Sequence, residues 1–174
     1  YVKLSNSNVL SLFNSKKRLE DTYNILADDL YETNINVYMN KKGIKCLKNA
    51  EDKSIVLGSK GFFEGVDVPG DGLVFVTLDK LPNLNPTDPL YFSIMTKFNK
   101  NYFDVNYPQM IIKVKQALGR LLRSKYDYGV FVLFNMGNST YINKKLENNL
   151  HGCIITEANR NNIQRYIYHH LKKS

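Results

Sequence analysis

The hydrophobic and polar positions of the chain form two kinds of pattern. Short apolar runs, typical of buried strands, occupy residues 8–14, 35–39, 54–57, 73–78, 128–134 and 153–156. Between them, apolar residues at helical spacing predict helices at 16–31, 89–100, 141–149 and 159–172, and one that is opened by Asn106 and Pro108. Because the strand runs are apolar on both faces and alternate with helices, the pattern predicts an α/β fold whose mostly parallel sheet is covered on both sides.

The helix that follows Pro108 has an unusual polar face. Gln116, Gly119, Arg120 and Arg123 stand at positions i, i+3, i+4 and i+7, so they share one stripe of the helix. Two guanidinium groups one turn apart suit a multiply charged oxyanion such as a nucleotide phosphate. The glycine costs about 1 kcal/mol of helix stability relative to alanine. Its presence therefore suggests that another group approaches the helix backbone closely at this position. A solvated basic face is the alternative interpretation.

A glycine-rich segment at residues 58–70 follows the third predicted strand. It contains Glu64 and Asp67, which are three residues apart and suit one face of a turn. Carboxylates do not cradle phosphates, but they accept hydrogen bonds from a ribose or pair with arginines. The alternative is a tight connection in which Phe62 and Phe63 fill the core. Ligands of parallel α/β sheets gather at the carboxyl ends of the strands, where residues 14–17, 58–70 and 79–80 are expected.

Composition narrows the class of partner. Among the 174 residues, Lys and Arg number 24 against 16 Asp and Glu, and the resulting formal charge of +8 favours a polyanion such as nucleic acid or nucleotide. Cys46 and Cys153 provide too few ligands for a zinc or iron–sulfur site and are expected to be free thiols in a reducing, cytoplasmic compartment. No metal site is expected at the histidines near the end of the sequence. No apolar run is long enough to cross a membrane.

Two sequence features indicate that the chain supplies only half of a site. The phosphate-binding pattern GxxxxGK[ST] does not occur in the sequence, and neither does an Asp-Glu-x-His box for magnesium. The sequence also begins without Met, so we expect residues 1–174 to be a single domain taken from a longer protein. A second domain would then complete the site.

Two segments together resemble a known family. Residues 60–70 (KGFFEGVDVPG) are similar to motif V of the DinG/XPD-type superfamily 2 DNA helicases, and residues 116–123 (QALGRLLR) to their motif VI, QxxGRxxR. Residues 79–82, 87–90, 107–108 and 124–132 also resemble DinG-type proteins, so the resemblance covers about residues 9–150. It implies the second RecA-like motor domain of such a helicase, a three-layer fold of the P-loop NTPase type without its phosphate loop. Phe63 stands where the family commonly has tryptophan.

The resemblance assigns roles at the nucleotide site. Arg123 is implied as the arginine finger, Arg120 as a second contact to the ATP phosphates and Gln116 as a γ-phosphate sensor. Glu64 and Asp67 are implied to contact the ribose or to brace the arginines. We also expect Gly119 in the nucleotide site. ATP and Mg²⁺ would be bound mainly by the first motor domain, and an iron–sulfur cluster, if present, would lie elsewhere in the full protein.

The same resemblance implies single-stranded DNA as a partner. The expected DNA contacts are Ser15, Lys16, Lys60 and Gly61, and the family moves 5′ to 3′. The other implied partner is the N-terminal motor domain of the same protein, with an exonuclease domain in some relatives. The alternative function is a regulatory domain that binds nucleotide or single-stranded DNA in a DinG-type exonuclease and does not unwind DNA.

Overall fold

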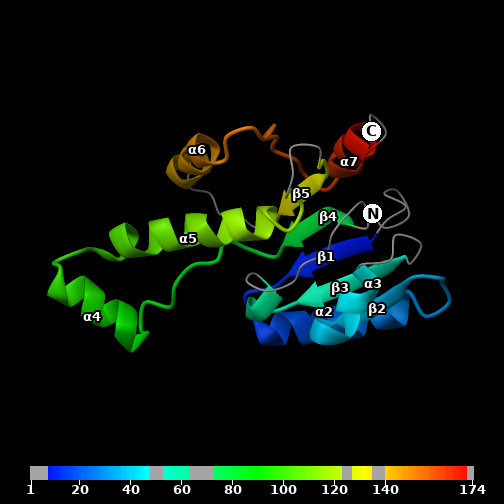
Figure 1. The fold of residues 1–174 in the computed structure, drawn as a ribbon, viewed down its shortest axis with the longest axis horizontal. Coiled ribbons are helices and arrows are strands. Elements are labelled where there is room, and N and C mark those ends of the chain that lie inside the picture. Colours follow the sequence, from blue (N-terminus) through cyan, green and yellow to red (C-terminus); the bar gives the residue numbers. More distant parts are fainter. Residues whose placement is uncertain (1–7, 48–52, 63–72, 123–126, 135–139, 172–174) are drawn as a thin grey trace.

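The central element is a five-stranded parallel sheet. The computed structural model describes residues 8–47, 53–62, 73–122, 127–134 and 140–171. The strands are β1 (Asn8–Leu12), β2 (Asn36–Met39), β3 (Ser54–Gly58), β4 (Leu73–Leu78) and β5 (Val130–Leu133). Their order is β2-β3-β1-β4-β5, and every pair is parallel (Figure 1). Five of the six predicted strands are therefore confirmed, with ends that agree within two residues.

Helices cover both faces of the sheet because side chains alternate along each strand. On one face, Leu10 and Val76 pack against α5 (Tyr102–Leu118), α6 (Thr140–Asn149) and the short α3 (Ile44–Leu47). On the other face, Val9 and Phe75 pack against α7 (Ile163–Leu171). Leu57 packs on that second face against α2 (Lys16–Asp29). The structure is thus the three-layer α/β fold that the sequence predicts.

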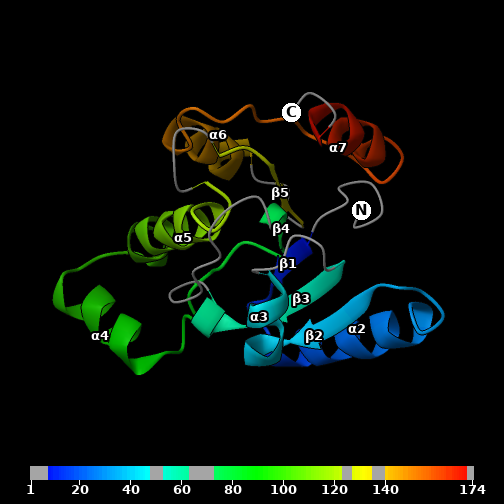
Figure 2. The ribbon, with the colours of Figure 1, turned by 45° about the vertical axis from the view of Figure 1, so that its right-hand side comes forward.

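A helical arm extends beyond the sheet. It consists of α4 (Pro89–Lys97) and the first turns of α5, and both ribbon views show it projecting away from the strands (Figures 1 and 2). No residue of α4 is buried, and Leu90 and Phe92 are each 63% exposed. The Asp88 side chain caps α4 by accepting from the Leu90 N–H at 3.0 Å.

Two predicted boundaries of α5 are wrong. The helix begins at Tyr102 with Asn101 as its cap, so Pro108 lies inside it and Asn106 is a buried residue of its second turn. The Asn106 side chain instead accepts from the Leu84 N–H at 2.7 Å. At the other end, α5 ends at Leu118. The residues after Gly119 form a turn, because the Arg120 and Leu121 N–H groups donate to carbonyls three residues earlier instead of four.

The predicted strand at 153–156 is also wrong. These residues lie in an irregular segment between α6 and α7, and Ile154 is 83% exposed. Two short 3₁₀ helices complete the described structure. These are η1 (Asn40–Gly43) and η2 (Lys60–Phe62), which follow β2 and β3.

Candidate nucleic-acid and nucleotide interface

The carboxyl ends of β1 and β4 are joined by a network around Asp79. The Asp79 side chain is almost fully buried, and its Oδ1 accepts from the Asn14 N–H at 3.2 Å and the Asn14 Nδ2 at 3.4 Å. The Asn14 Nδ2 also donates to the Lys80 carbonyl at 2.8 Å. The other carboxylate oxygen lies 3.4 Å from the Arg18 Nε. One buried carboxylate therefore fixes the loop after β1, and this loop leads directly into two of the predicted DNA contacts.

Those two contacts, Ser15 and Lys16, lie at the start of α2. The Ser15 hydroxyl caps the helix by accepting from the Arg18 N–H at 3.4 Å. The Lys16 side chain is 87% exposed and forms an ion pair with Glu20 at 3.7 Å. Such an exposed pair contributes little stability, so the ammonium group remains available to a phosphate. Contact with DNA at either residue stays a prediction.

The end of β3 turns sharply. A Cβ atom on Gly58 would come within 2.6 Å of the Phe62 ring, so glycine is required for this packing. Phe62 is buried in the core, as the alternative interpretation of the loop expects. Gly61, by contrast, is exposed and has no atom within 4 Å of its Cβ position, which leaves its backbone open to a ligand. The Lys60 side chain lies outside what the structure describes.

At the end of α5, the structure describes three of the four residues in the predicted stripe. Gly119 is the exposed C-cap, and the Arg120 N–H that follows donates to the Ala117 carbonyl at 3.2 Å. Arg120 is half-buried, and Gln116 is half-buried one turn earlier. The Gln116 Oε1 is buried, and no group of the described residues forms a hydrogen bond with it. Buried amide oxygens are normally paired, so this atom marks a place where an additional donor fits.

Three predicted site residues cannot be placed. Glu64, Asp67 and Arg123 lie outside the described residues. Their proximity to Gln116 and Arg120 therefore stays a prediction. Within the part of the chain that the structure describes, no cluster of three His, Cys, Asp or Glu side chains suits a metal ion. No helix among the described residues is long and apolar enough to cross a membrane.

The sequence interpretation missed three residues at this edge. The sequence pattern puts Asp79 at a strand end without indicating a role for it, and it indicates no role for Arg18 or Asn40. The Asn40 Oδ1 accepts from both the N–H and the hydroxyl of Ser59, each at 3.1 Å, and thereby joins the ends of β2 and β3. An Asn before two lysines and a glycine is a turn signal that was available in the sequence.

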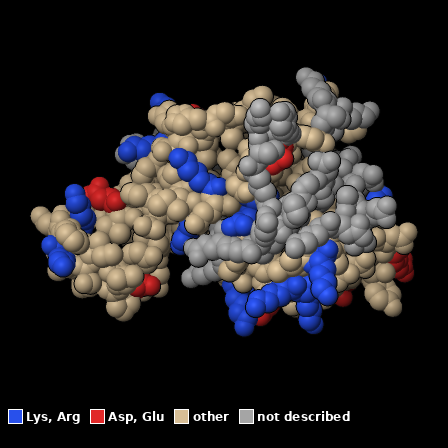
Figure 3. Space-filling model, viewed as in Figure 1, with Lys and Arg blue, Asp and Glu red and all other residues tan. Residues whose placement is uncertain are grey.

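The surface at this edge is basic. Figure 3 shows lysine and arginine side chains gathered over the region of α2 and β2. The exposed lysines at the start of α2 and directly after β2 include Lys16, Lys17, Lys41 and Lys42. A basic edge with fixed strand ends suits a polyanion.

Comparison with known proteins defines the family. The helicase C-terminal domain family matches residues 1–153, so the chain belongs to this family of helicase C-terminal domains. The protein named 3′-5′ exonuclease DinG from Staphylococcus epidermidis is 33% identical over 147 residues, which are 81% of this chain and 16% of that protein. The protein of the same name from Staphylococcus aureus MSSA476 is 32% identical over 150 residues, covering 82% of this chain and 17% of that protein. The chain thus spans about one sixth of these relatives.

The family assignment confirms the resemblance found in the sequence. The chain is a DinG-type helicase C-terminal domain, and its five-stranded parallel sheet with flanking helices agrees with a RecA-like fold.

Proposed function

We propose that this domain is the second motor domain of an ATP-dependent, DinG-type DNA helicase. In this proposal Arg123 is the arginine finger, Arg120 contacts the ATP phosphates and Gln116 senses the γ-phosphate. ATP hydrolysis takes place in a cleft between this domain and an N-terminal motor domain, and that domain holds most of the ATP and its Mg²⁺. The observation that carries the proposal is that Gln116, Gly119 and Arg120, the described residues of the QxxGRxxR sequence, lie at the end of α5 in a helicase C-terminal domain.

The burial of the Gln116 side-chain oxygen supports this proposal. This Oε1 is buried and has no hydrogen-bond partner in the part of the chain that the structure describes. Leaving a polar atom in this state costs roughly 1–3 kcal/mol, which is regained when a donor reaches it. A water molecule next to a γ-phosphate is a donor of this kind. Half-buried Arg120 stands four residues later and brings a guanidinium group to the same end of the helix.

In the proposed mechanism, these side chains stabilise charge. During hydrolysis, negative charge on the transferring γ-phosphoryl oxygens is offset by Arg123 and Arg120, and Gln116 orients the nearby hydrogen-bond donor. A finger of this kind raises hydrolysis rates by roughly 10³–10⁵. Glu64 and Asp67 contact the ribose or brace the two arginines. Closure of the two motor domains on ATP and their release after hydrolysis move single-stranded DNA by one step.

DNA would be held at the basic edge of the sheet. In this proposal Ser15, Lys16, Lys60 and Gly61 contact the phosphate backbone, and the Asn14–Asp79 bonds fix the first two of them. Exposed Lys16 and the open backbone at Gly61 support this assignment. Binding of this type weakens as salt rises, because it releases counterions from the nucleic acid.

The test compares ATP hydrolysis by the full-length protein with and without single-stranded DNA. The Arg123→Ala variant should lose at least 10³-fold in DNA-stimulated turnover while still binding ATP. The matched control is Arg165→Ala, an exposed arginine on α7, which should leave turnover unchanged. Turnover near the wild-type rate in Arg123→Ala would show that the finger is elsewhere. The 174-residue chain alone should not hydrolyse ATP, and robust hydrolysis by it would contradict the two-domain site.

The second candidate function is a regulatory domain of an exonuclease. The names of the relatives from both staphylococcal species favour it, since those proteins are described as 3′-5′ exonucleases. In that case nucleotide or DNA bound here would control nuclease activity without strand separation. An intact phosphate loop and acidic box in the N-terminal part of the protein would favour the motor, and a degenerate one the regulator.

A further inference from the structure

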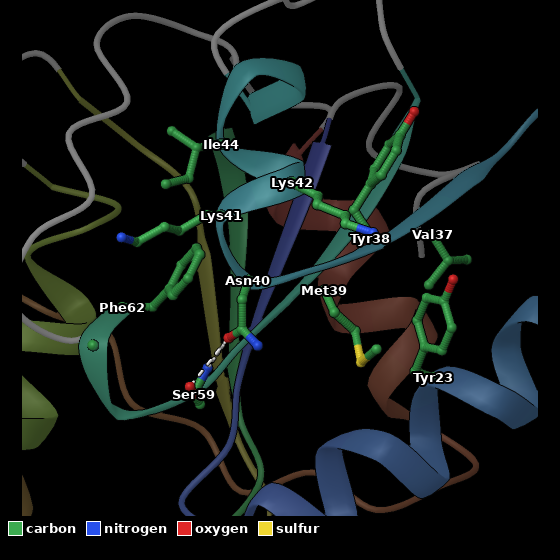
Figure 4. A pocket seen from close by; sticks show the side chains of 11 residues that line it. Tyr23, Val37, Tyr38, Met39, Asn40, Lys41, Lys42, Ile44, Ser59 and Phe62 are labelled. Carbon is green, nitrogen blue, oxygen red and sulfur yellow. Dashed lines mark hydrogen bonds between the residues drawn. The ribbon is translucent and has the colours of Figure 1, made fainter.

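The carboxyl ends of β2 and β3 border a cavity of which the proposed DNA site includes only Gly61. Its volume is about 810 Å³. The described residues that line it are Tyr23, Val37, Tyr38, Met39, Asn40, Lys41, Lys42, Ile44, Ser59, Gly61 and Phe62. Figure 4 shows Lys41, Ile44 and Phe62 on one side of the end of β2, and Tyr23, Val37 and Met39 on the other. The cavity therefore combines apolar and aromatic walls with two lysines.

A second cavity continues this space toward α2. It measures about 460 Å³, and it shares Met39, Asn40 and Ser59 with the first. Its lining also includes Asn14, Lys16 and Glu20, the carboxylate that pairs with Lys16. The two cavities together form one groove across the carboxyl ends of β1, β3 and β2. We call it the strand-end groove, and it begins at the predicted DNA contact Lys16, includes Gly61 and ends at Lys41 and Lys42.

The end of the groove at Lys41 and Lys42 is formed by the turn that follows β2. Asn40 has a left-handed backbone with φ of 51°, and its side chain is bonded to Ser59 on the neighbouring strand. Gly43 closes the turn against the sheet, where a Cβ atom would lie only 2.6 Å from the Val56 methyl groups. These contacts hold the intervening residues Lys41 and Lys42 at the rim of the cavity.

The charge at this rim is not neutralised within the described structure. Lys41 and Lys42 are exposed, and neither has a carboxylate within 4 Å among the residues that the structure describes. Of the described residues that line the larger cavity, none is acidic. Ammonium groups next to aromatic and aliphatic side chains are a combination that binds single-stranded nucleic acid, whose phosphates need cations and whose bases need apolar surface.

We propose that the strand-end groove extends the path of single-stranded DNA beyond β3, with Lys41 and Lys42 contacting phosphates and the cavity receiving a base. This inference rests on the proposed function, since it takes the DNA that this domain is expected to bind. Asn40 is a positioning residue in this proposal, because it fixes the lysine turn through Ser59. The half-buried ring of Tyr38 gives the base an apolar surface beside the lysines.

The test is a salt titration of single-stranded DNA binding by the full-length protein. The probe is a fluorescein-labelled oligothymidylate, and the readout is the slope of log affinity against log salt concentration. Each phosphate contact to a single strand contributes roughly 0.7 to this slope. The double variant Lys41→Gln/Lys42→Gln should therefore bind more weakly and have a slope smaller by roughly 1.4.

The matched control is Lys45→Gln/Lys53→Gln. It removes the same charge from exposed lysines that line neither cavity. An unchanged slope in the control beside a reduced slope in the groove variant supports the proposal. Equal slopes in wild type and the groove variant, or an equal reduction in both double variants, would overturn it while leaving DNA binding intact. A wild-type protein that binds no single-stranded DNA would instead overturn the proposed function together with this inference.

Discussion

Asn14 donates hydrogen bonds from both its backbone N–H and its side-chain amide to one carboxylate oxygen of Asp79, which lies 65 residues later in the chain. The two residues follow β1 and β4, which are neighbours in the sheet. Arg18 approaches the second oxygen at 3.4 Å. These interactions connect the start of α2, with the predicted DNA contacts Ser15 and Lys16, to the end of β4 in the central sheet.

The Asp79→Ala variant should therefore be less stable. It leaves the Asn14 N–H and the Arg18 guanidinium without their buried acceptor, and a lost buried partner costs about 1–3 kcal/mol. Denaturant unfolding of the 174-residue chain measures this change. Asp28→Ala, which removes an exposed carboxylate from α2, should stay within about 0.5 kcal/mol of wild type. Similar stability of both variants would show that the Asp79 network contributes little.

Substitution by alanine should lower the stability at one glycine and leave it unchanged at another. At Gly129, a Cβ atom would lie 2.5 Å from both the Val74 carbonyl oxygen and the Leu121 side chain. Because a backbone oxygen of β4 cannot move easily, Gly129→Ala should cost about 1–3 kcal/mol of stability. At Gly61 the same position is open, so Gly61→Ala should leave the unfolding midpoint nearly unchanged. Equal midpoints for the two variants would contradict the packing around Leu121.

The buried amide of Asn106 should be important for stability. It accepts from the Leu84 N–H at 2.7 Å, and its Nδ2 donates to the Asn83 Oδ1 at 2.9 Å. Asn106→Ala should cost about 1–3 kcal/mol, since it leaves a buried N–H unpaired. The control Asn24→Ala changes an exposed residue of α2. Hydrogen exchange at the Leu84 N–H provides the local measurement. Unchanged protection of this group in Asn106→Ala would show that Asn106 does not stabilise the chain at Leu84.

Tyr102 should make the stability depend on alkaline pH. Burial raises the pKa of the Tyr102 hydroxyl above its ordinary value of 10.0, and that hydroxyl donates to the Leu84 carbonyl at 2.7 Å. Because the folded pKa exceeds the unfolded one, the stabilisation is complete below about pH 10 and is lost as pH rises through the folded pKa. The stability difference between wild type and Tyr102→Phe should therefore narrow above pH 10. A stability difference between wild type and Tyr102→Phe that stays constant while the tyrosine ionises would contradict a raised pKa for the Tyr102 hydroxyl.

The sequence predicted the strands well because each is a continuous apolar run, and a strand buried on both faces needs one. The same rule failed at 153–156, where apolar Ile154 is exposed in an irregular segment. Local signals also misplaced the start of α5. Asn106 and Pro108 look like a cap and a first-turn proline, but tertiary contacts bury the asparagine one turn inside the helix.

The candidate site was predictable where residues are close in sequence. The spacing of Gln116 and Arg120 follows from helix geometry alone, and both reach the same end of α5. The ion pair between Arg18 and Asp79 was not predictable, because it depends on the strand order that makes β1 and β4 neighbours. The strand-end groove was not predictable for the same reason, because it forms only when β2 and β3 are neighbours in the sheet.

Strand separation by the full-length protein tests the motor assignment most directly. The substrate is a partial duplex with a single-stranded 5′ tail, whose strands carry a fluorophore and a quencher, and a gel checks that both strands stay intact. We predict ATP-dependent separation that requires the 5′ tail, fails with a 3′ tail and is abolished in Arg123→Ala. Intact duplex after ATP turnover, or signal that comes only from degraded strands, would contradict the motor and favour the regulatory domain of an exonuclease.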